Sequence, residues 1–224
     1  MVVKLSPSSL SLFTECPRCF WLSMNGIKQP GRIFPSLPSG FDSMLKKHFD
    51  SHREKGTVPE ELDGVDAQLF GDKAKLKEWQ NNFKGLSWQD GDYILRGAVD
   101  EILEKDGKLI VLDFKTRGFP LKEDTHEHYQ DQMNIYNFLL GKMGFKTTGY
   151  AYLLFFYPDK FNGKCQVLMN SELKKMKTKP KDAEKLFRDA IVCLEGPEPK
   201  SDKECWMCGY VEKKEIFNHT LKNP

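Results

Sequence analysis

The chain has 224 residues, of which 39% are hydrophobic and 29% are charged, and its formal net charge is +2. This composition is ordinary for a globular protein with a sizeable core, and the net charge is too small to indicate nucleic-acid binding by itself. The sequence has no long apolar run that would predict a transmembrane helix, and its first residues lack the pattern of a signal peptide, so we expect a cytoplasmic protein.

Hydrophobic periodicity predicts helices first, then a hairpin, a helix, two strands and further helices. The expected helices cover residues 5–22, 39–56, 72–84, 126–144 and 180–196. Ser6 is the expected N-cap of the first helix, and Pro7 suits its first turn. Residues 26–40 are rich in Pro and Gly and predict a loop. The apolar run 149–158 predicts a strand buried on both faces, with 164–170 as its neighbour. We therefore expect an α/β fold, a single domain over residues 1–224 with a mixed central β-sheet flanked by helices.

Residues 96–118 predict a β-hairpin that turns at Asp106 and Gly107, because an Asp-Gly pair between alternating apolar residues is typical of such turns. In a two-residue loop at this turn, Asp100 would face Asp113, and Ala98 would face Lys115. Two opposed carboxylates repel each other. One of them could be protonated, Lys115 could neutralise part of the charge, or Mg²⁺ or Mn²⁺ could lie between them. A solvated hairpin end with a salt bridge is the plainer alternative.

Several short motifs around this hairpin resemble those of a known enzyme family. They are GAVD at 97–100, LDFK at 112–115 and QMNIY at 132–136, preceded by a helical histidine in LKKHFD and by the opening SPSSLSLFTECPR. In this order they resemble the PD-(D/E)XK nucleases, and most closely the RecB-type branch that includes the CRISPR adaptation nucleases. The resemblance implies a restriction-endonuclease-like core and a metal-dependent deoxyribonuclease.

The resemblance also implies roles for single residues. The ligands of Mg²⁺ or Mn²⁺ would be His48, Asp100, Asp113 and the backbone carbonyl of Phe114. His52 lies one turn after His48 and is the alternative imidazole. Lys115 would position or activate the attacking water and stabilise the developing phosphate charge. Gln132 and Tyr136, four residues apart on one helix face, would line the active site and the DNA path.

The implied substrate is DNA, single-stranded or duplex. Basic residues that could contact its backbone are Lys46, Lys47, Arg53, Arg117 and Lys122, although a charged run is usually a solvated face. The chain has no G-x-x-x-x-G-K-[ST] motif, so a helicase would have to be a separate protein. Two alternatives therefore stay open: a non-catalytic DNA-binding module, and a subunit that acts with helicase or CRISPR adaptation proteins.

Two C-x-x-C pairs predict a second metal site, formed by four thiolates from opposite ends of the chain. The ligands would be Cys16, Cys19, Cys205 and Cys208. Many RecB-type relatives bind a 4Fe-4S cluster with one N-terminal and three C-terminal cysteines, and this chain departs from that pattern. On family grounds we expect a 4Fe-4S cluster, with Zn²⁺ as the alternative, because the spacing itself does not decide. Cys165 and Cys193 lie in strand and helix patterns and are expected to be core thiols.

Overall fold

The computed structural model describes residues 2–27 and 36–222, which divide between two compact units. The first, which we call the sheet unit, comprises residues 1–4 and 34–184, and the second, the cysteine unit, comprises residues 5–33 and 185–224. None of the helices in the described residues is both long and apolar enough to span a membrane.

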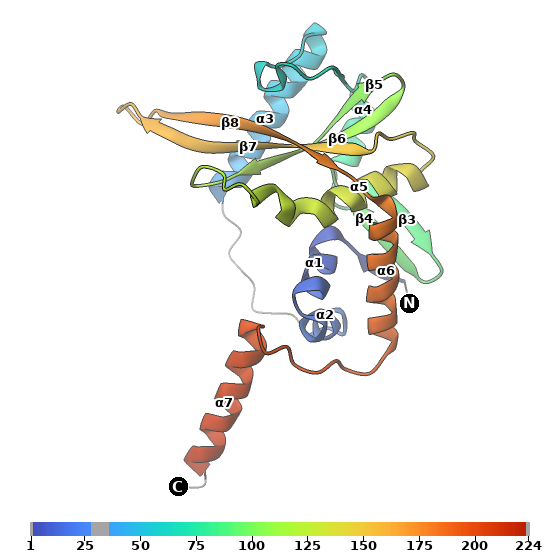
Figure 1. The fold of residues 1–224 in the computed structure, drawn as a ribbon, viewed down its shortest axis with the longest axis vertical. Helices are drawn as coiled ribbons and strands as arrows, with labels where there is room; N and C mark the ends of the chain where they lie inside the picture. The colour runs from blue at the N-terminus through green and yellow to red at the C-terminus, as the bar shows by residue number, and fades with distance from the viewer. Residues whose placement is uncertain (1, 28–35, 223–224) are drawn as a thin grey trace. The chain divides into compact units, whose positions relative to one another are not determined.

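The elements follow one another in an order that alternates helices and strands (Figure 1). They are β1 (Val3–Leu5), α1 (Pro7–Glu15), α2 (Pro17–Met24), α3 (Ser36–Lys55), η1 (Glu60–Leu62), β2 (Gln68–Leu69), α4 (Lys73–Trp79), β3 (Leu86–Asp90), β4 (Tyr93–Gly97), β5 (Glu101–Lys105), β6 (Lys108–Thr116), η2 (Thr125–Tyr129), α5 (Gln130–Lys142), β7 (Tyr150–Phe161), β8 (Val167–Lys177), α6 (Pro180–Glu195) and α7 (Trp206–Lys222).

A five-stranded mixed sheet forms the centre of the sheet unit, with the strand order β2-β5-β6-β7-β8. Strands β6 and β7 are parallel, and the other neighbouring pairs are antiparallel. A parallel pair requires a crossover, and helix α5 lies in the connection from β6 to β7 (Figure 1). The expected α/β class and mixed central sheet with flanking helices are therefore confirmed.

The predicted hairpin turn is present, but its first strand is shorter than expected. Asp106 and Gly107 have φ angles of 51° and 68°, the left-handed values that a two-residue I′ turn requires, and β6 begins at the next residue. The expected register holds from the turn as far as the pair Glu101 and Leu112, where the ladder ends. Asp100 and Asp113 are therefore not a ladder pair, and Ala98 does not pair with Lys115.

The ladder ends because the chain changes sheets at this point. Residues 93–97, which we expected partly within the hairpin, form β4 in a second sheet with the order β1-β4-β3. This sheet was missed, although its turn carries a Gly-Asp signal: Asp90 pairs with Tyr93, so Gly91 and Asp92 form the β3–β4 turn, and Gly91 has a φ of 58°. The expected strand across residues 96–105 was wrong, since three residues, 98–100, separate β4 from β5.

Successive side chains of β6 point to opposite faces of the sheet, and each face contacts a different helix. Leu112 and Phe114 belong to the core cluster that also contains Leu45 and Phe49 of α3, and the rings of Phe49 and Phe114 have centroids 4.8 Å apart. The intervening residues of β6 point to the opposite face, where the side chain of Lys115 reaches α5. The sheet thus has an apolar face toward α3 and a second face toward α5, on which Asp113 and Lys115 lie beside buried apolar residues such as Leu153.

Two of the expected helices have different bounds. Residues 5–22 form α1 and α2 rather than one helix, because Pro17 disfavours a helical conformation at Cys16, whose φ is −161°. The N-cap prediction is confirmed, since Ser6 Oγ accepts a bond from the N–H of Ser9. The expected helix 72–84 ends at Trp79, because the Asn81 side chain accepts the N–H groups of residues 83 and 84, and the side chain of Phe83 is exposed.

The remaining differences concern loops and a cysteine. Helix α3 begins at Ser36, so residues 36–40 are helical rather than part of the expected loop, whose residues 28–35 lie outside the described residues. Proline is tolerated in a first helical turn, which is where Pro38 lies. Strand β8 begins only at Val167, and Cys165 is exposed in the β7–β8 turn with a φ of 59°. The expectation that Cys165 is a core thiol was wrong.

Candidate active site and four-cysteine centre

Asp113 is a buried carboxylate on the side of β6 that faces α5. Its relative exposure is 2%, and Lys115, two residues along the same strand face, forms an ion pair with its Oδ2 atom. That contact lacks hydrogen-bond geometry, so Oδ2 is buried without a hydrogen-bond donor. Burial raises the pKa of Asp113 to about 7; the Lys115 charge opposes this rise and the charge of Asp100 adds to it.

Asp100 lies beside the same strand although it is outside the ladder. Its Oδ2 atom accepts the backbone N–H of Phe114 at 3.0 Å, and its Oδ1 atom lies 3.0 Å from Nζ of Lys46. Lys46 Nζ also donates to Asp42 Oδ2 at 2.8 Å. Burial alone would lower the pKa of Lys46, but the charges of Asp100 and Asp42 outweigh burial, so the pKa is raised and the side chain stays charged. The two aspartates therefore lie near two ammonium groups, Lys46 and Lys115.

Lys46 was expected only as a contact for the DNA backbone. The structure places it against Asp100, on the face of α3 that also carries Asp42 and Phe49. The helical spacing of Asp42, Lys46 and Phe49 was the available signal, since residues three and four apart share a face. What the sequence did not show was that this face of α3 turns toward β6.

A chain of hydrogen bonds joins Lys115 to helix α5. Lys115 Nζ donates to Gln132 Oε1 at 2.9 Å, and Gln132 Nε2 donates to Tyr136 Oη at 2.8 Å. Burial, and then the charge of Asp113, raise the pKa of Tyr136 above its ordinary value, so its hydroxyl group remains protonated. The structure thus brings together Asp113, Lys115, Gln132 and Tyr136.

Gly97 connects this chain of hydrogen bonds to the second sheet. A Cβ atom at this position would lie 2.7 Å from Cε1 and 3.0 Å from Cδ1 of Tyr136, distances too short for any side chain. Tyr136 is itself buried, so its ring has little room to move. Packing therefore explains why the G-x-x-D motif begins with glycine. Because Gly97 has no side chain, the ring of Tyr136 can lie against β4.

The histidines of α3 do not join the aspartates. His48 Nε2 lies 3.2 Å from Glu61 Oε2, and His48 borders a separate cavity of about 600 Å³ together with Met44 and Glu61. His52 Nδ1 is bonded to Thr57 Oγ1 at 2.9 Å. Within residues 2–27 and 36–222, the four cysteines are the only group of three or more His, Cys, Asp or Glu side chains close enough to hold one ion. His48 lies two residues after Lys46, about 200° further around the helix, which turns it away from Asp100.

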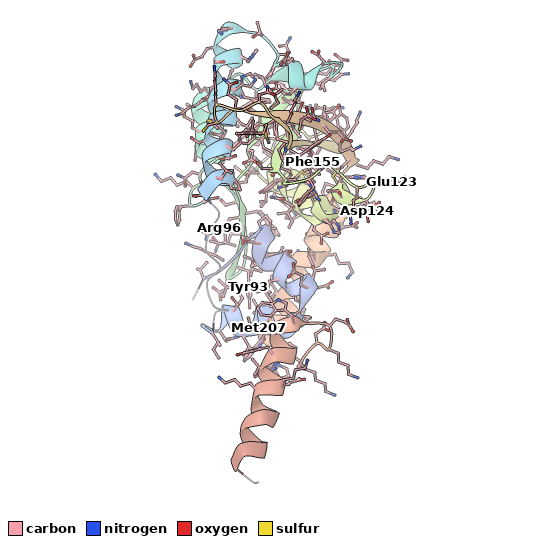
Figure 2. All side chains as sticks on the ribbon, turned by 90° about the vertical axis from the view of Figure 1, so that its left-hand side faces the viewer. Tyr93, Arg96, Glu123, Asp124, Phe155 and Met207 are labelled. Atoms are coloured by element: carbon pink, nitrogen blue, oxygen red, sulfur yellow. The ribbon has the colours of Figure 1, made fainter. Side chains whose placement is uncertain are left out.

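The other basic residues have different surroundings. Arg53 is 5% exposed, and its guanidinium group pairs with buried Glu101 at 2.5 Å, so it is part of the fold rather than of a DNA surface. Lys47 and Lys122 are exposed, and Arg117 is half-buried with no partner for its Nε atom. Glu123 and Asp124, the residues after Lys122, are also exposed (Figure 2). These acids weaken the attraction of that loop for phosphate groups.

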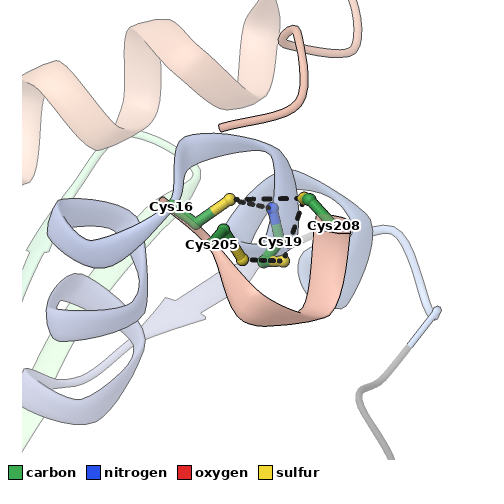
Figure 3. A group of neighbouring side chains, drawn as sticks. All are labelled: Cys16, Cys19, Cys205 and Cys208. Carbon is green, nitrogen blue, oxygen red and sulfur yellow. Dashed lines mark hydrogen bonds between the residues drawn. The ribbon is translucent and has the colours of Figure 1, made fainter. Parts of the chain in front are cut away.

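The four predicted cysteines meet in the cysteine unit (Figure 3). Sγ of Cys19 lies 3.6 Å from Sγ of Cys205 and 3.8 Å from Sγ of Cys208. Sγ of Cys16 lies 3.8 Å from that of Cys208, and all four ligand atoms lie within 4.8 Å of one another. Cys193 is outside this group, half-buried, with its Sγ 3.9 Å from the Pro17 carbonyl oxygen.

Backbone N–H groups point at the sulfur atoms of both pairs. Cys16 is the N-cap of α2, and its Sγ accepts the N–H of Cys19 at 3.4 Å. Burial raises the pKa of Cys16. Burial acts in the same direction on Cys205, but the N–H groups of Cys208 and Met207 and the nearby thiols outweigh it, so the pKa of Cys205 is lowered. The surroundings of Cys205 thus favour its thiolate, which is the metal-binding form of cysteine.

A sequence profile of the PD-(D/E)XK nuclease superfamily matches residues 38–212 of the chain. The chain belongs to the PD-(D/E)XK nuclease superfamily. The matched region contains the hairpin, α5 and the second C-x-x-C pair, and it begins after the first pair. Among curated proteins no match is found.

Nucleases of this superfamily use divalent metal ions, and the residues of the sheet unit fit such an ion. Asp113 Oδ2 is a buried carboxylate oxygen that forms an ion pair with Lys115 but no hydrogen bond, so it has lone pairs left to bind a cation. Asp100 adds a second carboxylate, and carboxylates are the ligands that Mg²⁺ and Mn²⁺ prefer. This superfamily member therefore has a donor set suited to a hard divalent cation.

Proposed function

We propose that this protein is a metal-dependent DNA nuclease whose active site lies between β6 and α5. The observation that carries the proposal is the connected set of Asp113, Lys115, Gln132 and Tyr136, with Asp100 at its edge. Each of these residues belongs to a motif of the superfamily. Their assembly from separate parts of the chain supports a shared chemical role.

Phosphodiester hydrolysis needs a water nucleophile and relief of the negative charge that develops on the phosphate. A bound Mg²⁺ or Mn²⁺ ion would lower the pKa of water and offset phosphate charge. In our proposal its ligands are Asp100, Asp113 and the backbone carbonyl of Phe114. We leave His48 out of this set, because its Nε2 atom is engaged with Glu61.

Lys115 is proposed to act on the attacking water and on the phosphate. Its Nζ atom is fixed by Gln132 and by the carboxylate of Asp113, so its charge is oriented before substrate binds. Tyr136 stays neutral at the end of the chain of hydrogen bonds, where its Oη atom accepts the bond from Gln132 Nε2. Gln132 is the residue that links the two side chains.

The proposed substrate is DNA, with Lys47, Arg117 and Lys122 as phosphate contacts. We propose that both units belong to one nuclease domain, because the superfamily match extends from residue 38 to residue 212 and so includes parts of each. The RecB-type likeness of the motifs suggests a role in DNA repair, recombination or CRISPR adaptation in the cytoplasm. A subunit that cleaves only beside helicase or adaptation proteins is the second form of this proposal.

The test is cleavage of end-labelled single-stranded DNA, duplex DNA and RNA with Mn²⁺, Mg²⁺ or EDTA. We expect metal-dependent cleavage of DNA that falls by at least about 100-fold in Lys115→Ala, because a preorganised charge at the reacting phosphate is lost. Lys108→Ala is the matched control, since Lys108 is an exposed lysine at the other end of the same strand. Its activity should equal that of the wild type.

Other outcomes separate the alternatives. DNA binding without cleavage by a folded wild type would favour the non-catalytic module. Cleavage that appears only after a partner is added would favour the subunit. Equal activity of Lys115→Ala and wild type would show that the catalytic site lies elsewhere.

A further inference from the structure

The distances between the cysteine sulfur atoms are those of a single metal ion. Neighbouring sulfurs lie 3.6 to 3.8 Å apart, and the largest separation among the four ligand atoms is within 4.8 Å. Four thiolates at the Zn–S bond length of about 2.3 Å form a tetrahedron with edges of about 3.8 Å. The cysteine side chains therefore leave room for one tetrahedral ion at their centre.

The same distances disagree with the cluster that the family resemblance implies. In a 4Fe-4S cubane each cysteine binds a different iron atom at its own corner, so two thiolate sulfurs are separated by two Fe–S bonds and by the edge of the metal core. Sulfurs less than 4 Å apart cannot bracket such a core. The sequence points the same way, because residues 209–224 contain no cysteine that would complete a set of three with Cys205 and Cys208.

The remaining cysteines do not supply the missing ligand. Cys165 lies in the β7–β8 turn of the sheet unit and is exposed, and Cys193 Sγ faces the carbonyl of Pro17. Neither sulfur belongs to the group of four. The ligand set is therefore two cysteines from the start of the chain and two from its end.

Both pairs are built in the same way. In each, the first cysteine lies just before a helix and its carbonyl accepts a helical N–H bond, from Phe20 in the first pair and from Gly209 in the second. The second cysteine lies one turn later, so the two sulfurs of a pair lie at a helix N-terminus, where partial positive charge favours thiolates. Two such turns facing each other give four convergent sulfurs without an open ligand position.

We propose that these cysteines bind one Zn²⁺ ion as a closed four-thiolate site, and not an iron–sulfur cluster. Soft thiolates in a tetrahedral array select zinc among ions with no redox role, and a closed set of four protein ligands is structural rather than catalytic. The ion would tie residues 16–19 to residues 205–208 within the cysteine unit. The zinc site is independent of the proposed nuclease, because its ligands lie entirely in another part of the chain.

The first test is the metal content of the full chain, expressed with both iron and zinc supplied and purified without oxygen. We expect about one zinc per chain, no acid-labile sulfide and no visible absorption. Replacement by Co²⁺ should give the intense d–d and thiolate charge-transfer bands of tetrahedral four-thiolate cobalt. Stoichiometric iron, with or without sulfide, would overturn the proposal.

The second test assigns the ion to these cysteines. Cys208→Ser should lose most of the bound zinc, whereas Cys165→Ser, which removes an exposed thiol outside the group, should keep it. If Cys208→Ser fails to fold, the cobalt spectrum of Cys165→Ser still tests the proposal. Bands of full four-thiolate intensity would support it. Weaker bands, typical of fewer thiolate ligands, would contradict it. Unchanged zinc in a folded Cys208→Ser would also overturn it.

Discussion

Asp113, a ligand in the proposed metal site, is buried at a cost in stability. It is nearly fully buried, its Oδ2 atom has no hydrogen-bond donor, and burial raises its pKa to about 7. Lys115 offsets part of the cost through an ion pair. In our proposal a divalent cation beside Asp113 offsets this cost, so the metal-free protein should show the cost directly.

Asp113→Asn should therefore stabilise the metal-free protein at neutral pH. The native pKa of about 7 lies above the unfolded value of 3.8, so the native state holds the proton more tightly. The stability that the tighter proton binding gives to the native state is fully present below about pH 4 and is lost as pH rises through 7. The loss is at most about 4 kcal/mol, at about 1.4 kcal/mol per pKa unit. Urea unfolding in EDTA from pH 4 to pH 8, comparing variant with wild type, measures it.

The difference between the two proteins is what matters, because other carboxylates titrate in the same pH range. We expect the free energy of unfolding of Asp113→Asn, relative to that of the wild type, to increase between pH 4 and pH 7. A difference that does not change with pH would contradict the raised pKa. Addition of Mn²⁺ should favour the wild type alone, since the ion requires the ionised carboxylate.

At the scale of elements, the proposed active site depends on close packing between β4 and α5. Gly97 ends β4, and the ring of Tyr136 on α5 occupies the space where a side chain would begin. The hairpin turn at Asp106 was predictable from two residues. The sheet change at residues 98–100 was not, because it depends on this packing rather than on local preference.

Gly97→Ala should lower the free energy of unfolding by about 1–3 kcal/mol, the usual cost of overpacking a buried contact. Its Cβ would lie 2.7 Å from Tyr136 Cε1, and the ring cannot move away without disturbing its bond to Gln132. Denaturant unfolding gives the change in stability. The proposed nuclease activity should fall together with it.

Gly118→Ala is the control for this prediction. A Cβ atom at Gly118 would meet open space, and the residue has no left-handed φ, so alanine should change stability by less than about 0.5 kcal/mol. Equal stability of Gly97→Ala and wild type would mean that Tyr136 does not lie against β4. In that case the link between the two motifs would be lost.

For the whole molecule, the cysteine site joins segments that are far apart in the sequence. Residues 5–33 and 185–224 form one unit, and besides the cysteines the bonds between these segments include Arg18 to Glu198 at 2.7 Å and Trp21 to Gly196 at 3.1 Å. Closing the loop between Cys19 and Cys205 costs roughly 5 kcal/mol of chain entropy. A structural thiolate site contributes about 10 kcal/mol or more at neutral pH, so bound metal outweighs that cost.

Removal of the metal should therefore loosen the cysteine unit before the sheet unit. With a strong chelator we expect faster hydrogen exchange in α1, α2 and residues 185–214, while the amides of β5, β6 and β7 remain protected. Cys165→Ser should respond as the wild type does. Equal loss of protection in β6 would show that the metal supports the whole chain rather than one unit.

The sequence alone determined the local features of this protein. An Asp-Gly turn, a capped helix at Ser6, a long apolar strand and two C-x-x-C pairs each depend on neighbouring residues, so the turn, the N-cap, a buried β7 and the four thiol ligands were predictable. The motif order also pointed correctly to the superfamily.

Only the tertiary structure decided which side chains meet. A residue's place on a helix can be counted, but the direction in which that helix faces depends on its packing, so Lys46 rather than His48 lies against Asp100. The sheet change after Gly97 and the spacing of the cysteine sulfurs are likewise set by contacts between distant segments. Those contacts arise from burial of whole faces, which no short stretch of sequence contains.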